Sequence, residues 1–224
     1  MTQILSRTGC YPRLPIGECL IKQRTGSVQS VSSVPKNKRN FVELRVLGGE
    51  NKTQKNMQTR GIRNNNPLNI RHSADKWQGA SVEQTDKSFV QFKSMAYGYR
   101  AVWRILQTYY ERFAHQSRGF TVRNIISRWA PPKENDTEAY IRTVLQLTGI
   151  GGKENLLPPS NVDSYDRLAK LISAMTCVEC GIPIQRVDNE AIFQGYRLAF
   201  PENQAELDAY FIARDEYFGW SPYA

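Results

Sequence analysis

The sequence predicts an α+β fold that is mostly helical, with a small antiparallel sheet and four or five helices, preceded by a basic irregular arm. Three observations lead to this prediction: apolar residues recur at helical spacing after residue 95, short alternating stretches lie between residues 61 and 92, and residues 1–56 show no sustained apolar period. We therefore expect three parts. Residues 1–56 form the arm, residues 57–200 the globular domain, and residues 201–224 an acidic, aromatic C-terminal helix and tail.

The arm carries most of the net charge. The formal charge of the 224 residues is +9; residues 1–60 contain eleven Lys/Arg against three Asp/Glu, whereas residues 61–224 contain nineteen against eighteen. A nucleic-acid-binding domain normally gathers its basic residues on one face. A nucleic-acid partner is therefore only weakly indicated, through the arm. The arm is either a flexible or partly ordered appendage, or an over-extended reading frame upstream of a true start at Met57.

Membrane and export signals are not apparent in the sequence. No stretch approaches the roughly twenty apolar residues that cross a bilayer, and Arg7, Pro12 and Arg13 interrupt the N-terminal stretch where a signal peptide would be apolar. We expect synthesis in the cytoplasm and reduced cysteines. The pair Cys177 and Cys180 lacks the two further ligands of a zinc site. We expect neither a metal nor a cofactor.

The region between residues 61 and 92 is rich in turns. Asn64-Asn65-Asn66-Pro67 predicts a structured turn, because asparagine side chains bond nearby backbone and tolerate the left-handed conformation. Strand-like stretches follow at residues 68–71, 80–84 and 88–92, and we expect them to form the small sheet. A further strand-like alternation lies in the arm at residues 40–47.

Helices are expected from residue 96 onward. Their boundaries come from apolar periodicity, from Thr121 and either Asn135 or Asp136 as N-terminal caps, and from Gly149 and Gly181 as terminators. The expected segments are residues 96–114, 122–129, 136–148, 163–180 and a last helix from residue 203.

Clustered amides and aromatic rings are the candidate ligand-contacting groups. Amides both donate and accept hydrogen bonds, which suits sugar hydroxyl and acetamido groups, and aromatic rings can stack on a sugar face. The alternative is that the amides cap the turn and that the rings belong to the core. The residues are Asn64, Asn66, Asn69, Trp77, Trp129 and Tyr140.

Carboxylates are the candidate catalytic groups, because cleavage of a glycosidic bond needs a proton donor and commonly a second carboxylate. Glu83 and Asp86 lie near the expected sheet, and Glu134 lies in a proline-framed loop. Asp136, the other acid of that loop, is well placed as a helix cap. The candidate acids are therefore Glu134 first, then Glu83, with Asp86 or Asp136 as an auxiliary carboxylate.

A family resemblance accompanies these patterns. The chain resembles phage and mobile-element structural (virion) proteins that are related to lysozyme-like, peptidoglycan-degrading domains. The resemblance covers about residues 60–181 and depends on motifs in a fixed order. They are Arg60-Gly61-Ile62-Arg63-Asn64-Asn65-Asn66-Pro67-Leu68-Asn69-Ile70-Arg71, Trp77-Gln78-Gly79, Asp86 with Phe89 and Phe92, Ile126-Ser127-Arg128-Trp129-Ala130-Pro131-Pro132, and Tyr140-Ile141.

This resemblance implies a lysozyme-like domain, a cell-wall glycan as ligand, and action at the bacterial wall or within a phage particle, with other virion proteins as further partners. It implies a peptidoglycan-cleaving enzyme or, alternatively, a non-catalytic virion structural or wall-binding protein. Lysozyme-like enzymes carry their acid on an early helix ahead of the sheet, and no helix is expected before Asn64. The acid is therefore Glu134 or Glu83, or the domain binds glycan without cleaving it.

Overall fold

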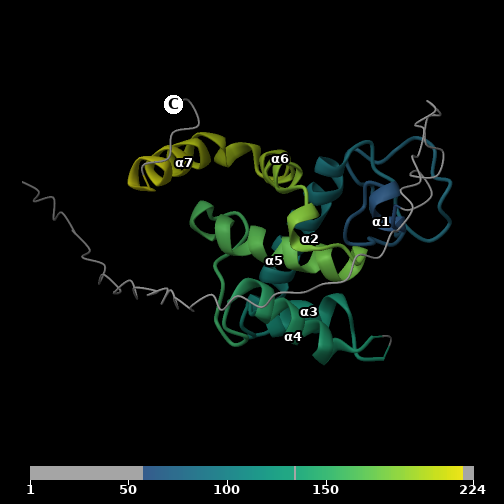
Figure 1. Ribbon diagram of the computed structural model, residues 1–224, viewed down its shortest axis with the longest axis horizontal. Helices are drawn as coiled ribbons and strands as arrows, with labels where there is room; N and C mark the ends of the chain where they lie inside the picture. Colours follow the sequence, from purple (N-terminus) through teal and green to yellow (C-terminus); the bar gives the residue numbers. More distant parts are fainter. Residues whose placement is uncertain (1–57, 134, 219–224) are drawn as a thin grey trace, which may run out of the picture. The chain divides into compact units, whose positions relative to one another are not determined.

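The computed structural model describes residues 58–133 and 135–218, and these residues form helices joined by turns (Figure 1). The expected arm with its residues 40–47, and the tail beyond Phe218, lie outside the described residues. No described helix is both long and apolar enough to cross a membrane. The helices are α1 (Arg60–Arg63), α2 (Met95–His115), α3 (Val122–Trp129), α4 (Thr137–Thr148), α5 (Tyr165–Cys180), α6 (Asn189–Ala199) and α7 (Gln204–Phe218), with short 3-10 turns η1 (Val162–Ser164), η2 (Ile184–Arg186) and η3 (Pro201–Asn203).

The capping residues expected from the sequence delimit these helices. The Thr121 side chain accepts a hydrogen bond from the Asn124 amide at 3.2 Å and begins α3. Asp136 accepts from the Ala139 amide at 2.9 Å and begins α4. Gly149 ends α4 in the left-handed conformation, which glycine adopts without steric cost. The boundaries expected for α2, α3 and α4 are therefore confirmed to within one residue.

Helix α6 was not expected from the sequence. Asp188 caps it by accepting from the Ala191 amide at 2.9 Å, and its inner face includes Ile192, Gly195 and Tyr196. Glycine at the centre lowers helix propensity and leaves a gap in the apolar stripe, which hides the helical period. That glycine allows close packing on α2, because a Cβ at position 195 would lie 2.9 Å from the backbone nitrogen of Arg100.

The expected antiparallel sheet is wrong. The described residues contain no strand, and the stretches that were expected to pair meet only at two isolated bridges, Arg71 with Phe89 and Ala80 with Phe92. Side-chain amides satisfy backbone groups that a sheet ladder would otherwise use. Asn66 donates to the carbonyls of Ile70 and Val90 at 2.9 and 2.8 Å. Residues 64–92 therefore form turns that side-chain hydrogen bonds hold in place, and the fold is helical.

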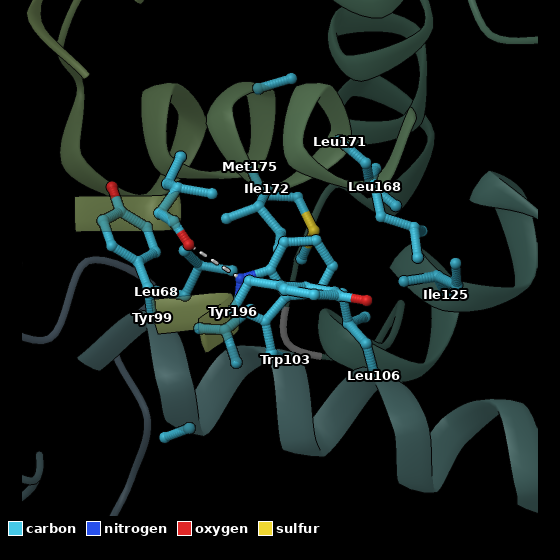
Figure 2. Packing of buried hydrophobic residues seen from close by; sticks show 14 of the residues in the cluster. Leu68, Tyr99, Trp103, Leu106, Ile125, Leu168, Leu171, Ile172, Met175 and Tyr196 are labelled. Carbon is cyan, nitrogen blue, oxygen red and sulfur yellow. Dashed lines mark hydrogen bonds between the residues drawn. The ribbon is translucent and has the colours of Figure 1, made fainter. Parts of the chain in front are cut away.

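Trp103 of α2 lies at the centre of the core (Figure 2). Its side chain is fully buried, its ring stacks on Tyr165 at 5.9 Å, and it meets Tyr196 edge-on at 5.0 Å. Its indole N–H donates to the Ile192 carbonyl at 3.1 Å, so burial leaves no polar atom of this ring unpaired. Helices α2, α5 and α6 meet around this side chain, and α4 packs on α5.

Candidate functional site

Most amides of the asparagine-rich turn are used inside the fold. The amide group of Asn66 bonds the backbone on both sides, donating to two carbonyls and accepting from the Ile70 amide at 2.8 Å, and the residue has no exposed surface. Asn64 is also buried and donates to Asp86 at 2.7 Å. A ligand would reach either side chain only if the turn opened, so both serve structural roles in this conformation.

Asp86 holds the turn to the first helix. Its two oxygens accept from the Arg60 guanidinium at 2.6 Å each, a bidentate pair, and it also accepts from the backbone amides of Ser88 and Phe89. The Arg60 guanidinium is the largest influence that holds the pKa of Asp86 well below its usual range, and the hydrogen bond from Asn64 adds to it. These contacts stabilise the ionised form, which is the form of an auxiliary carboxylate, and the predicted role of Asp86 stays a prediction.

Three of the residues expected to contact sugar converge instead on Glu179, which was not among the predicted site residues. Trp129 and Tyr140 each donate to Glu179 Oε1 at 3.2 Å, and the Asn69 side-chain amide donates to Oε2 at 3.0 Å. The Asn69 amide also lies 3.3 Å from the Glu179 carbonyl oxygen. We name these four residues, Asn69, Trp129, Tyr140 and Glu179, the Glu179 cluster.

The Glu179 cluster joins four separate segments. Asn69 comes from the turn region, Trp129 ends α3, Tyr140 lies on the inner face of α4, and Glu179 is in the last turn of α5. Tyr140 is buried, whereas the other three members are half-buried. Burial, together with the nearby negative charge of Glu179, raises the pKa of the Tyr140 phenol far above its usual value. The phenol therefore stays protonated and remains a donor to the carboxylate.

The position of Asn69 depends on its backbone conformation and on a close approach by α2. Asn69 has φ 53°, in the left-handed region that asparagine tolerates better than most residues. The turn that carries it lies against Gly98, where an added Cβ would be 2.1 Å from the Asn65 carbonyl oxygen. The asparagine-rich sequence thus supplies the conformation, and Gly98 supplies the space.

Among the other described site residues, Trp77, Glu83 and Asp136 make no hydrogen bond to this cluster. Trp77 is half-buried against the core, and its buried indole N–H has no hydrogen-bond partner within the described residues. Glu83 is exposed in a segment without regular secondary structure. Asp136 is the cap of α4. Glu134 lies outside the described residues, between Trp129 and Tyr140 in the sequence. The predicted roles of these residues stay predictions.

The sequence contains one weak indication that Glu179 is a functional residue. An acidic side chain in the last turn of a helix faces the negative end of the helix dipole, and α5 has no basic residue in that turn to offset it. Such local conflicts often mark functional positions. The signal was obscured because Glu179 stands between Cys177 and Cys180, where the cysteine pair was the evident feature.

Two cavities lie elsewhere in the described fold. One of about 420 Å³ lies between α4, α5 and α6, with Tyr165, Lys170 and Ser173 in its wall, and another of about 340 Å³ is lined by residues that include Tyr110 and Arg118. Neither is lined by a member of the Glu179 cluster. Among the described residues, no group of three or more His, Cys, Asp and Glu side chains gathers closely enough to hold a metal. We assign the candidate site by its chemistry, because the cluster concentrates a carboxylate, two aromatic rings and an amide.

Comparison with known proteins shows a phage relative. No family model matches the chain. The chain is 42% identical to "Protein P5" of Pseudoalteromonas phage PM2 over 132 residues, which are 58% of this chain and 76% of the relative. Identity at this level over most of the relative's length establishes common descent. The chain therefore belongs to the family of Protein P5 of Pseudoalteromonas phage PM2.

Proposed function

We propose that this chain is a virion-associated protein of a phage or integrated mobile element that binds the glycan strands of the bacterial cell wall through the Glu179 cluster. The observation that carries the proposal is the convergence of Asn69, Trp129 and Tyr140 on one carboxylate. The phage relative supports the virion context, although its name states no ligand or activity. The relationship to lysozyme-like domains is part of the same proposal.

The chemistry of the cluster suits a sugar polymer. Carbohydrate sites combine aromatic faces, which contact the apolar side of the ring, with amide and carboxylate groups that bond hydroxyls. Trp129 and Glu179 are only half-buried, so both have surface to offer. Tyr109 extends the aromatic surface, because its ring meets Trp129 edge-on at 6.4 Å. A sugar unit bound next to Trp129 would then have a second aromatic ring nearby.

The test is co-sedimentation of the full chain with purified peptidoglycan sacculi. We expect Glu179→Ala to lose most of the binding, because the carboxylate accepts hydrogen bonds from the other three cluster members and holds them in position. The matched control is Glu206→Ala, which removes an exposed carboxylate on α7 and should leave binding unchanged. Absence of binding by the unmodified chain would reject the wall-binding role. The virion role has its own test, which is detection of the chain in purified particles by mass spectrometry.

Cleavage of the glycan is a second candidate, and one observation favours it. The loop of residues 130–136 begins beside Trp129 and ends shortly before Tyr140, so Glu134 lies between two cluster members in sequence. A pair formed by Glu134 and Glu179 would supply the proton donor and second carboxylate that glycoside hydrolysis commonly uses. Release of soluble muropeptides, followed by mass analysis, tests this. Glu134→Gln should then lower the rate by about 10²–10⁴-fold, and an unmodified chain that releases nothing has no such activity.

A further inference from the structure

Glu179 carries a negative charge that no described residue neutralises. The ion pairs among the described residues join Arg60 to Asp86, Arg123 to Glu138, Arg167 to Glu154 and Arg214 to Asp166, and none involves Glu179. Its three side-chain partners are neutral donors. These donors compensate part of the hydration that the carboxylate loses on burial, but they bring no opposite charge.

The place of Glu179 in α5 adds to this imbalance. The last turn of a helix bears a partial negative charge from its unpaired carbonyls, which favours cations and disfavours carboxylates. Helix α5 has no basic residue in its last turn. Both the helix end and the side chain therefore present negative potential at the same point.

One acceptor position of the carboxylate is still open. A carboxylate accepts about four hydrogen bonds, two on each oxygen. Trp129 and Tyr140 occupy Oε1, whereas only Asn69 donates to Oε2. No second donor reaches Oε2 from the described part of the chain, so this position is available to a ligand group that donates.

We infer that the Glu179 cluster selects a cationic group, and that its preferred ligand is a glycan whose sugar rings carry free amines, such as glucosamine units without the acetyl group. This inference rests on the proposed glycan-binding function and names the ligand class. An ammonium bound to Oε2 fills the open acceptor position and offsets the charge of both the carboxylate and the helix end. The attached sugar ring then lies near Trp129, whose half-buried ring suits its apolar face.

The experiment compares two trisaccharides of equal length, one of glucosamine and one of N-acetylglucosamine, binding to the full chain in isothermal titration calorimetry. A charge-assisted hydrogen bond is about twice as strong as a neutral one, so we expect the amine form to bind about tenfold tighter at low salt. The preference should shrink at high salt, because screening weakens a half-exposed pair. Glu179→Gln should abolish it, since the amide keeps the shape of the side chain and loses the charge.

Glu206→Gln on α7 is the control for non-specific attraction of a cationic sugar to acidic surface, and it should keep the full preference. Equal affinity for the two trisaccharides would overturn the inference and leave the glycan-binding proposal intact. A preference that persists in Glu179→Gln would also overturn it, because the charge would then act elsewhere. Binding to sacculi without binding to either trisaccharide would overturn it as well, and would move recognition to another wall component.

Discussion

Asn69 and Glu179 are 110 residues apart in sequence and are joined by the Asn69 side-chain amide, which lies 3.0 Å from Glu179 Oε2 and 3.3 Å from the Glu179 carbonyl oxygen. One side chain thus ties the asparagine-rich turn both to the carboxylate and to the backbone at the end of α5. The site depends on the packing of the turn region against the helices, because neither part holds the cluster alone.

Two substitutions of Asn69 should distinguish the contribution of its side-chain hydrogen bonds from the contribution of its backbone conformation. Asn69→Gly keeps the left-handed φ of 53° available and removes the amide, so we expect weaker glycan binding with a modest loss of stability. Asn69→Ala removes the same amide and also strains the backbone, at an added cost of about 1–2 kcal/mol. Urea unfolding of the two variants should show this difference, while their glycan binding should be equally weak. Full binding by Asn69→Gly would contradict a role for the amide.

Gly98→Ala should damage the site through the turn. The added methyl group would lie 2.1 Å from the Asn65 carbonyl oxygen and 2.9 Å from Pro67, so either the turn or the start of α2 must move. Overpacking of this kind typically costs about 1–3 kcal/mol.

The control for this substitution is Gly149→Ala. Nothing lies within 4 Å of the added atom there, but its φ of 68° strains an alanine by about 1–2 kcal/mol. The two variants should lose similar stability in urea unfolding, and only Gly98→Ala should lose glycan binding. Equal binding by both would show that the turn tolerates displacement.

Helices α2 to α4 were predictable from sequence because each has a clear apolar stripe, and α3 and α4 also have a capping residue. The absence of a sheet from the described residues was not predictable, because the choice between a backbone ladder and side-chain hydrogen bonds depends on where the Asn66 and Gln91 side chains point, and periodicity carries no such information. The predicted sugar-contacting roles of the site residues stay predictions. Asn69, Trp129 and Tyr140 were among the residues chosen for sugar contact, but their meeting point at Glu179 depends on long-range packing.

A shortened chain that begins at Met57 should unfold as cooperatively as the full chain, because residues 1–56 offer no periodic apolar face to bury. Thermal unfolding of both chains, monitored by circular dichroism, measures this. A fall of more than about 4 °C in midpoint, roughly 1–2 kcal/mol for a domain of this size, would show that the first 56 residues contribute to the fold.

The same pair of chains tests the weak nucleic-acid indication, because salt-sensitive DNA binding should be lost with the basic arm.

Alkaline pH should destabilise the fold through its buried tyrosines. Burial raises the pKa of Tyr99, Tyr140 and Tyr165 above the usual value for a phenol, and it also raises the pKa of the Cys180 thiol. The unfolded chain releases phenol protons near pH 10, at about the ordinary pKa, while the folded chain retains them. Since the folded state then binds more protons, the free energy of unfolding falls as pH rises above about 10 and is unaffected by these tyrosines well below that pH.

Urea unfolding in steps between about pH 8 and pH 11 measures this slope. Tyr140→Phe removes one of the three phenols and should flatten the alkaline slope, although the variant is also less stable at neutral pH because Glu179 Oε1 loses a donor. A slope that is unchanged in Tyr140→Phe would mean that this phenol already ionises near its ordinary pKa in the folded protein. In that case the Tyr140 phenol would not be buried and hydrogen-bonded to Glu179 as the structure describes.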